Sequence, residues 1–256
     1  MAERRGLVRS EAIMLEILQT QWKAGSTYED TYVTRYTDEW ESTVSVNGDL
    51  TENADEIIER EIEYHQSLGR SFEWKLFSSD VPSDLLDRLI ARGFKVGIKE
   101  VVCAMDISQE LPEMNPSICV KRVQTESELS DFRSVAEDVF QKSFSYTTAA
   151  LAKCIAEGTE DQVGFVAYGG VTPVSIGRVD HYDRATCAGL YTGATLGAYR
   201  GRGFYRAIVA ARAAFAKSQG ASIIWVDARP TSLPILQKLG FEAVVETWPC
   251  DFSVTN

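Results

Sequence analysis

The stretch from Cys187 to Val226 constrains the fold of this 256-residue chain most. The pattern of Cys187–Thr195 predicts a strand, and Phe204–Gln219 is an amphipathic, alanine-rich pattern that predicts a helix ended by Gly220. A second apolar run, Ser222–Val226, follows directly. These segments predict a strand, helix, strand unit, which is typical of α/β folds.

The remaining elements of the second half extend this unit into a mixed sheet. The predicted strands are Ile118–Val123, Gln162–Tyr168, Val174–Asp180 and Ala243–Phe252, and the predicted helices are Glu126–Phe140, Thr147–Glu157 and Ser232–Leu239. Strands in meander order, followed by a strand, helix, strand unit, predict an α/β fold with helices on the faces of a mixed sheet.

A segment with two prolines, Leu111–Pro116, predicts a domain boundary. We therefore expect one domain over residues 1–115 and another over residues 116–256. The first carries predicted elements in the order helix, strand, helix, strand: Ala54–Leu68, Phe72–Phe77, Ser83–Arg92 and Val96–Met105. The pairs Gly93-Phe94 and Gly240-Phe241 each follow a short amphipathic helix, so two related domains are expected, with chance similarity as the alternative.

The distribution of charge bears on the class of partner. The chain has 26 basic and 37 acidic side chains, for a net charge of −11. Residues 1–115 hold 12 basic and 23 acidic side chains, whereas residues 116–256 hold 14 of each. Binding to nucleic acid needs a basic footprint, so no nucleic acid partner is expected. An acidic surface that serves solubility is the alternative to a preference for a cationic partner.

Cysteine and hydropathy patterns exclude further classes. The five cysteines are widely spaced and only two histidines are present, so neither a disulfide framework nor a metal site is expected. No run approaches the roughly 18 apolar residues of a membrane span, and no apolar block follows the first residues. We expect no membrane association and a cytoplasmic location, and the sequence predicts no oligomeric state.

The approach to the alanine-rich helix has an unusual charge pattern. Thr195–Arg206 contains three arginines and three glycines, and no carboxylate occurs before Lys217. The N-terminus of a helix carries about half a positive charge, so cations gathered there are unfavourable unless an anion binds. Glycines let backbone N–H groups approach such an anion closely. The pattern predicts a phosphate-bearing ligand, with a turn whose arginines point to solvent as the alternative.

This segment resembles the pyrophosphate loop of the GCN5-related N-acetyltransferases (GNAT family), Arg-x-x-Gly-x-Gly/Ala after a strand. Arg200 to Phe204 match it, and Tyr205 stands at the last Gly/Ala position. The resemblance implies an acyl-CoA N-acyltransferase-like fold and acetyl-CoA as cosubstrate, without a metal. The residues it implies for cofactor binding are Ala194, Thr195, Arg200, Gly201, Arg202, Gly203, Phe204, Tyr205 and Ser232.

Two departures from the family pattern affect the catalytic side chains. Leu236 stands where the family often has a tyrosine that serves as general acid, and Gly189 stands where it often has a carboxylate. Asp227 and Asp180, at the ends of predicted strands, are the candidate bases. Tyr191 is the candidate acid, from a pool that also includes Tyr199 and Tyr205.

Each candidate also has a structural reading. Asp227 is expected to be either a base or an ion-pair partner of Arg229 or Arg178. A strand tyrosine is more often a packing residue. His181 is expected to be exposed in a turn.

The first half resembles the C-terminal part of the same family. Its helix is entered through Val46–Glu56, which contains four carboxylates where a pyrophosphate would bind. It is therefore expected to be a degenerate, truncated, noncatalytic copy. The expected activity is acetyl transfer from acetyl-CoA to the amine of a small-molecule or peptide acceptor, for which the charge favours a cation. The alternatives are an acyl-CoA-binding pseudoenzyme that acts as a regulatory module and a phosphate-binding scaffold unrelated to CoA.

Overall fold

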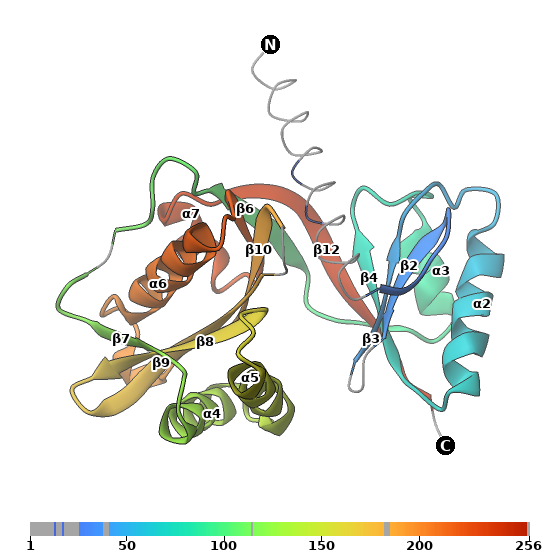
Figure 1. Cartoon of the computed structure of the whole chain (residues 1–256). Helices are drawn as coiled ribbons and strands as arrows, with labels where there is room; N and C mark the ends of the chain where they lie inside the picture. The colour runs from blue at the N-terminus through green and yellow to red at the C-terminus, as the bar shows by residue number, and fades with distance from the viewer. Residues whose placement is uncertain are drawn as a thin grey trace, which may run out of the picture. The chain divides into compact units, whose positions relative to one another are not determined.

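The computed structural model describes residues 13, 17, 26–37, 41–113, 115–181 and 185–254 (Figure 1). The chain forms two compact units. Unit 1 comprises the described residues of Met1–Cys103, Asp227–Lys238 and Glu242–Asn256, and unit 2 comprises those of Ala104–Val226 and Leu239–Phe241. Among the described residues, no helix combines the length and apolar character needed to cross a membrane.

Unit 1 is built on strands in the order β1-β2-β3-β4-β12-β6. The pairs β1–β2, β2–β3 and β4–β12 are antiparallel, and β3 and β4 are parallel. Its strands are β1 Ser26–Glu29, β2 Val33–Thr37, β3 Ser42–Val46, β4 Phe72–Phe77, β5 Lys95–Val96, β6 Glu100–Asp106 and β12 Glu242–Phe252, and its helices are α2 Ala54–Ser67, α3 Leu85–Ala91 and α7 Leu233–Lys238. β5 pairs with β12 beside this path, and β6 ends in unit 2.

The core of unit 1 lies between this sheet and helices α2 and α3. Alternate residues of β4, Phe72, Trp74 and Leu76, are buried in one cluster with Ile58 of α2 and Leu89 of α3. The period of two on the strand and the helical spacing on α2 place these side chains on facing surfaces.

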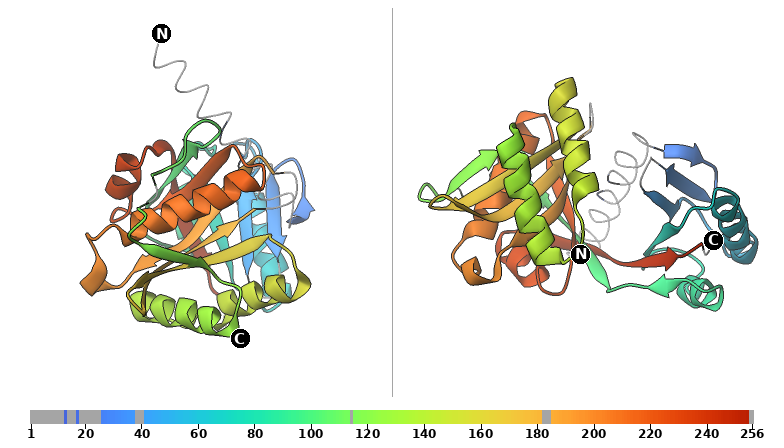
Figure 2. Two further views of the ribbon diagram at one scale, coloured as in Figure 1. Left: turned by 60° about the vertical axis from the view of Figure 1, so that its left-hand side comes forward. Right: turned by 90° about the horizontal axis from the view of Figure 1, so that it is seen from below.

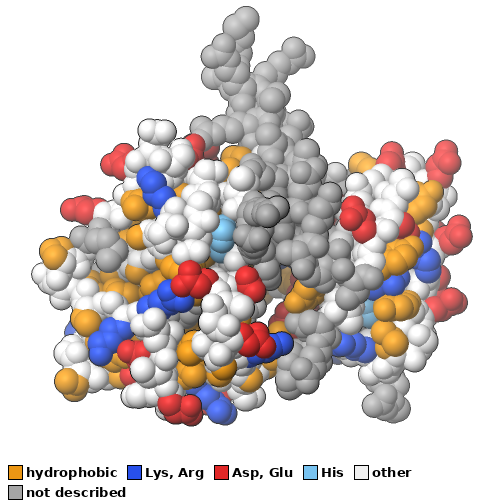
Figure 3. Space-filling model, viewed as in Figure 1, with side chains coloured by type: hydrophobic (Ala, Val, Ile, Leu, Met, Phe, Trp, Pro, Cys, Tyr) orange, Lys and Arg blue, Asp and Glu red, His pale blue; other side chains and the backbone are white. Residues whose placement is uncertain are grey.

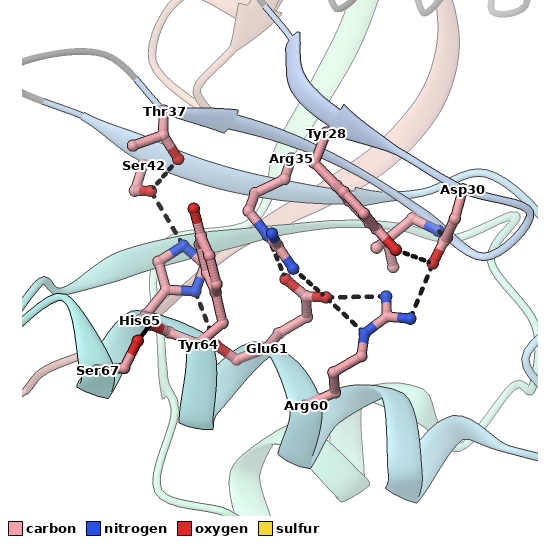
Figure 4. Close-up of polar contacts among 11 residues, drawn as sticks. Tyr28, Asp30, Arg35, Thr37, Ser42, Arg60, Glu61, Tyr64, His65 and Ser67 are labelled. Carbon is pink, nitrogen blue, oxygen red and sulfur yellow. Dashed lines mark hydrogen bonds and ion pairs between the residues drawn. The ribbon is translucent and has the colours of Figure 1, made fainter.

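A polar network joins α2 to the first strands inside this unit (Figure 4). Arg35 of β2 donates to both carboxylate oxygens of Glu61, at 2.8 and 2.9 Å, and neither residue is exposed beyond 6%. The guanidinium lies over the rings of Tyr64 and Tyr28, at 3.6 and 4.5 Å from their centroids. Arg60 adds ion pairs to Glu61 and Asp30. A buried carboxylate is thereby shared by two cations, which offsets its loss of hydration.

His65 lies next to this network and is fully buried. Its Nδ1 is 2.7 Å from the carbonyl oxygen of Glu61, so Nδ1 carries the proton, and Nε2 accepts from the hydroxyl of Ser42 at 3.0 Å. The ring stacks on Phe72 at 3.9 Å. These contacts fit the neutral ring with its proton on Nδ1, and burial, which lowers the pKa of His65 from 6.5, favours that form.

Unit 2 is a smaller mixed sheet in the order β11-β10-β9-β8-β7. β10 and β11 are parallel and the other pairs are antiparallel. Its strands are β7 Cys119–Arg122, β8 Gln162–Gly169, β9 Thr172–Asp180, β10 Cys187–Thr195 and β11 Ile223–Ala228, whose last two residues belong to unit 1, and its helices are α4 Glu126–Phe140, α5 Ser145–Glu157 and α6 Phe204–Ser218.

Helices cover both faces of this sheet, α4 and α5 on one and α6 on the other (Figure 1, Figure 2). The core under α4 and α5 contains Phe132, Leu151, Val166 and Ile176. Thr125 begins α4 with a capping box, in which its hydroxyl and the carboxylate of Glu128 satisfy backbone N–H groups.

The α/β fold with a mixed sheet is confirmed, and the elements predicted for the second half lie within a few residues of the observed ones. The strands β1, β2 and β3 were not predicted. Their inward positions include Arg35 and Ser42, so an apolar alternation is absent. The strand predicted over Val96–Met105 is divided into β5 and β6 around Gly97, whose N–H donates to the carbonyl of Pro249.

The compact units differ from the expected domains over residues 1–115 and 116–256. β12 belongs to unit 1 because Thr247–Phe252 pairs with Phe72–Phe77 in antiparallel register. The boundary in the first half falls within β6 rather than in the proline-containing segment. The compact units are thus divided at other places than the expected domains, and the domains over residues 1–115 and 116–256 stay a prediction.

The burial of neutral His65 predicts a pH dependence of stability. Burial lowers its pKa from 6.5, against the opposing effect of Glu61, and Arg35 and Arg70 add to the lowering. The unfolded chain takes up this proton at about pH 6.5, before the folded chain does. The free energy of unfolding should therefore fall as the pH drops below about 6.5 and should keep this contribution above that value. In urea denaturation at about pH 7.5 and about pH 5.5, His65→Gln should lose less stability than the wild type, and equal losses would contradict the assignment.

Candidate functional site

The centre of unit 2 is an interruption in the pairing of β10. β10 pairs with β11 only from Cys187 to Gly189. Its register with β9 shifts between Tyr191 and Ala194, and Thr192 lies in the bulge with a φ of 52°. A positive φ is uncommon for a β-branched residue, so the surrounding structure holds this conformation. The backbone of Thr192 and Gly193 lies outside both ladders.

The loop after β10 presents backbone N–H groups at the start of α6. Gly203 is the N-cap with a φ of 86°, and Gly201 has a φ of 72°, conformations that favour glycine. No side chain caps the helix and its first turn contains no acid. Among the described residues, no ion pair involves Arg200, Arg202 or Arg206, which are all exposed. This helix start has the geometry and charge of an anion site.

Aromatic and arginine side chains pack around the loop between β10 and α6. The Tyr199 ring lies on Gly169, where a Cβ would be 2.9 Å from the ring, and packs edge-on against Phe204. The Arg202 guanidinium lies 5.3 Å from the centroid of the Tyr199 ring, and Nε of Arg200 donates to the carbonyl of Thr195 at 3.2 Å.

Ala194 and Thr195 are buried at the end of β10. The hydroxyl of Ser175 donates to the carbonyl of Ala194 at 2.8 Å and lies 2.7 Å from the hydroxyl of Thr195. These two residues fasten the strand end.

Arg178 contacts both Asp180 and Tyr191, whereas the sequence analysis considered it as a partner of Asp227. Arg178 binds Asp180 through Nε and Nη2, at 2.7 and 2.9 Å, and its guanidinium lies 5.0 Å from the centroid of the Tyr191 ring. Gln162 donates to the same carboxylate at 3.3 Å. Tyr191 packs edge-on against Trp225. Asp180 is thus an ion-paired carboxylate, and Tyr191 lies on the same face of the sheet.

Asp227 has a partner that neither expected reading named. Its Oδ2 lies 2.7 Å from Nζ of Lys75, on β4 in unit 1, whereas Arg178 binds Asp180 and Arg229 binds Glu100. The predicted partners of Asp227 were therefore wrong. Nζ of Lys75 also lies 3.9 Å from Glu100.

Lys75 is the centre of an acidic cluster in unit 1. Burial disfavours its charged form, but Asp227, Glu73 and Glu100 together raise its pKa. Burial raises the pKa of Glu73 to about 7, with Lys75 opposing and the nearby carboxylates adding to the shift. The lysine therefore remains a cation, and it offsets the repulsion among the carboxylates around it.

The two positions that depart from the family pattern, Gly189 and Leu236, are both enclosed by neighbouring side chains. A Cβ on Gly189 would lie 2.6 Å from the ring of Tyr191 and 3.1 Å from that of Trp225, so the tyrosine takes the space of a side chain there. Leu236 is fully buried in α7.

Two other sequence expectations have different outcomes. His181 is only 6% exposed and donates from Nε2 to the carbonyl of Ala185, so the expectation of an exposed turn histidine was wrong. Ser232 lies in unit 1, where its N–H and hydroxyl bind the carbonyl of Arg229. Within the described part of the chain, no group of three or more His, Cys, Asp or Glu is arranged to hold a metal.

Acidic side chains of unit 1 gather over α2 and the turn before it (Figure 3). The exposed acids there are Glu52, Asp55, Glu56, Glu59 and Glu63. Asp55 and Glu56 occupy the first turn of α2, the position that is free of acids in α6. This helix start is complementary to cations rather than to phosphate.

Comparison with known proteins identifies the fold. No family model matches the sequence, and no curated protein matches it. A GCN5-related N-acetyltransferase from Kribbella flavida is 12% identical, with 96% of this chain and 95% of that chain covered and a TM-score of 0.68. One from Sphaerobacter thermophilus is 12% identical, with 88% and 76% covered and a TM-score of 0.65. A tandem GNAT protein from the clavulanic acid biosynthesis pathway is 9% identical, with 88% and 79% covered and a TM-score of 0.57. The chain therefore shares its mixed α/β fold with GNAT acetyltransferases.

Sequence analysis missed the roles of three side chains that organise these sites. Arg178 alternates with Asp180 on one strand, a spacing that places both on one face. Arg212 is a single cation on the apolar side of a helix that contains Ile208 and Ala216, which is a detectable anomaly. Lys75 gave no signal, because its pairing with Asp227 joins residues 152 positions apart.

Loss of the Lys75 charge should destabilise unit 1. Lys75→Met leaves Asp227, Glu73 and Glu100 without their shared cation, and breaking a buried pair in this way costs about 3 kcal/mol or more. Lys99→Met is the matched control, because Lys99 pairs with Glu246 at the surface and such pairs contribute about 1 kcal/mol or less. Equal urea midpoints for the two variants would contradict the central role of Lys75.

Proposed function

We propose that this protein is an N-acetyltransferase that uses acetyl-CoA. The observation that carries the proposal is the start of α6, where Gly203 opens a helix without acids and three arginines have no carboxylate partner among the described residues. GNAT acetyltransferases among the structures of the same fold support it. Acetyl-CoA supplies a thioester, which is an acyl group activated for transfer to an amine.

The residues of the loop fit the charged part of this cosubstrate. The N–H groups from Arg202 to Tyr205 would hold the pyrophosphate, with Arg200 and the backbone of Ala194 and Thr195 beside them. Phe204, Gly201 and Ser232 remain proposed contacts from the family resemblance. Nothing acidic in the first turn of α6 opposes a dianion there.

The reaction needs a base for the amine and a proton for the departing sulfur. An alkylammonium with a pKa near 10.4 is almost wholly protonated at pH 7, so assistance is required. Asp180 and Asp227 remain the proposed bases and Tyr191 the proposed acid. Arg178 binds one of these carboxylates and covers the ring of Tyr191, and so holds both in place.

Unit 1 is proposed to be the degenerate, noncatalytic copy. The acids at the start of α2 would repel a pyrophosphate, by about 1 kcal/mol or more for each close pair of charges in partly screened surroundings. The same acids favour a cationic acceptor, a small molecule or a peptide, through electrostatic attraction.

A CoA-binding pseudoenzyme is the second candidate function. The observation that favours it is that both proposed bases already bind cations, Lys75 and Arg178, while positions 189 and 236 carry Gly and Leu. Release of free thiol from acetyl-CoA with a panel of amines separates the two functions. Thiol release above the hydrolysis rate supports the transferase, and CoA binding without it supports the pseudoenzyme.

Gly203→Asp tests the site itself. The substitution places a carboxylate where the pyrophosphate would bind, so calorimetry should show at least about a tenfold loss of CoA affinity. Gly158→Asp is the matched control, because Gly158 also has a positive φ, 68°, and ends α5 with open space around its Cα. Its backbone cost is similar, about 1 kcal/mol, and its CoA affinity should equal that of the wild type. Unchanged affinity in Gly203→Asp would refute the proposed site.

A further inference from the structure

Arg212 of α6 is a fully buried arginine at the bulge of β10. Its side chain is 1% exposed, and Nη1 donates to the carbonyl oxygens of Arg178 at 3.1 Å and Tyr191 at 3.2 Å. Nε lies 3.4 Å from the carbonyl of Ile208 in its own helix. The guanidinium also bonds to the hydroxyl of Tyr205. All of these residues belong to unit 2.

The fold leaves room for this side chain at two glycines. A Cβ on Gly177 of β9 would lie 2.8 Å from Cζ and Nε of Arg212. A Cβ on Gly193 would lie 3.0 Å from the ring of Tyr205 and 3.6 Å from Nη2 of Arg212. The guanidinium is thus enclosed between α6 and the bulge.

In the part of the chain that the structure describes, no carboxylate balances the charge of Arg212. No ion pair among the described residues involves this arginine, and burial lowers its pKa against the opposing effect of Tyr205. A guanidinium nevertheless keeps its proton in proteins. The dipoles of the carbonyl groups therefore compensate the charge of the buried Arg212 guanidinium. Because dipoles offset a full charge only in part, the surroundings of the guanidinium favour a negative charge.

The carbonyl of Tyr191 belongs to the same peptide group as the N–H of Thr192. In a trans peptide these two groups point in opposite directions, so the N–H of Thr192 points away from Arg212. It lies in the part of β10 where pairing with β11 has ended. A hydrogen bond from a cation to the carbonyl polarises the peptide and strengthens its N–H as a donor.

The family resemblance implies that a backbone N–H of this strand donates to the thioester carbonyl. We infer that Arg212 is a positioning residue for acyl transfer, which acts through the Tyr191–Thr192 peptide to hold the N–H of Thr192 in place for that contact. The inference rests on the proposed function. When an amine nitrogen attacks, the N–C bond forms and the carbonyl π pair moves to oxygen, to which this N–H donates a hydrogen bond. The pair returns as the C–S bond breaks, the amine proton passes to the base, and the thiolate takes a proton from the acid.

The carbonyl stretch of bound acetyl-CoA, labelled with ¹³C at the thioester carbon, tests this without turnover or a known acceptor. The wild type should bind the probe with the stretch at lower frequency than in free acetyl-CoA. Arg212→Gln, which is neutral but still donates, should return it most of the way to the free value, and Arg212→Lys, which keeps the charge, should retain most of the shift. Lys217→Gln is the control on the same helix and should match the wild type. With an active amine, kcat should fall at least about tenfold in Arg212→Gln at nearly constant CoA affinity.

The outcomes separate the inference from the proposed function. Absence of acetyl-CoA binding to the wild type would overturn both. Binding with an unshifted carbonyl, or with equal frequencies in the wild type and Arg212→Gln, would overturn the role of Arg212 and leave the function standing. Equal effects of the Gln and Lys substitutions would also overturn it, since they would assign a packing role. If Arg212→Gln fails to fold, the wild type and Arg212→Lys still decide, because loss of the shift in the charge-retaining variant would contradict the inference.

Discussion

A strand that leaves its hydrogen-bond ladder must find other partners for its carbonyl and amide groups. β10 does this between Tyr191 and Ala194, and the arrangement of unit 2 depends on the result. Arg212 binds the carbonyls of Tyr191 and Arg178, so a side chain of α6 takes the place of a neighbouring strand. The released part of β10 leads directly into the loop that opens α6. One helix therefore supplies both the N–H groups at its start, which no side chain caps, and the cation that fixes the bulge.

Helices α2 and α6 use the same dipole in opposite ways. Each helix start carries about half a positive charge. In α2 that charge is balanced by the carboxylates of Asp55 and Glu56. In α6 no acid of the first turn balances it, and nearby arginines add to the positive charge. The first arrangement stabilises a helix without a ligand, whereas the second gains most when an anion binds. This difference in charge at the helix start is what favours the start of α6 over that of α2 as an anion site.

The sequence was most informative where backbone conformation is restricted. Gly203 and Gly220 mark the ends of α6, and both have positive φ in the structure, so this helix was predicted within a residue. The pairing of Lys75 with Asp227 was not predictable, because it needs the register of β4 against strands far away in sequence. The burial of Arg212 depends on Gly177 in β9 and Gly193 in β10, and the sequence around Arg212 does not reveal these neighbours. Buried polar contacts such as Arg35 with Glu61 also break the apolar alternation by which strands are detected.

The pairing of β12 with β4 has a consequence for the order in which the protein is made. The hydroxyl of Thr247 donates to the carbonyl of Leu76, across 171 residues, and the six-residue register beside it completes the sheet of unit 1. Domains generally fold as they leave the ribosome, N-terminal parts first. The edge of β4 in unit 1 therefore stays unpaired until all of unit 2 has been synthesised, and such an edge is a template for aggregation. Nascent chains halted before β12 should therefore depend on chaperones more than the finished protein does.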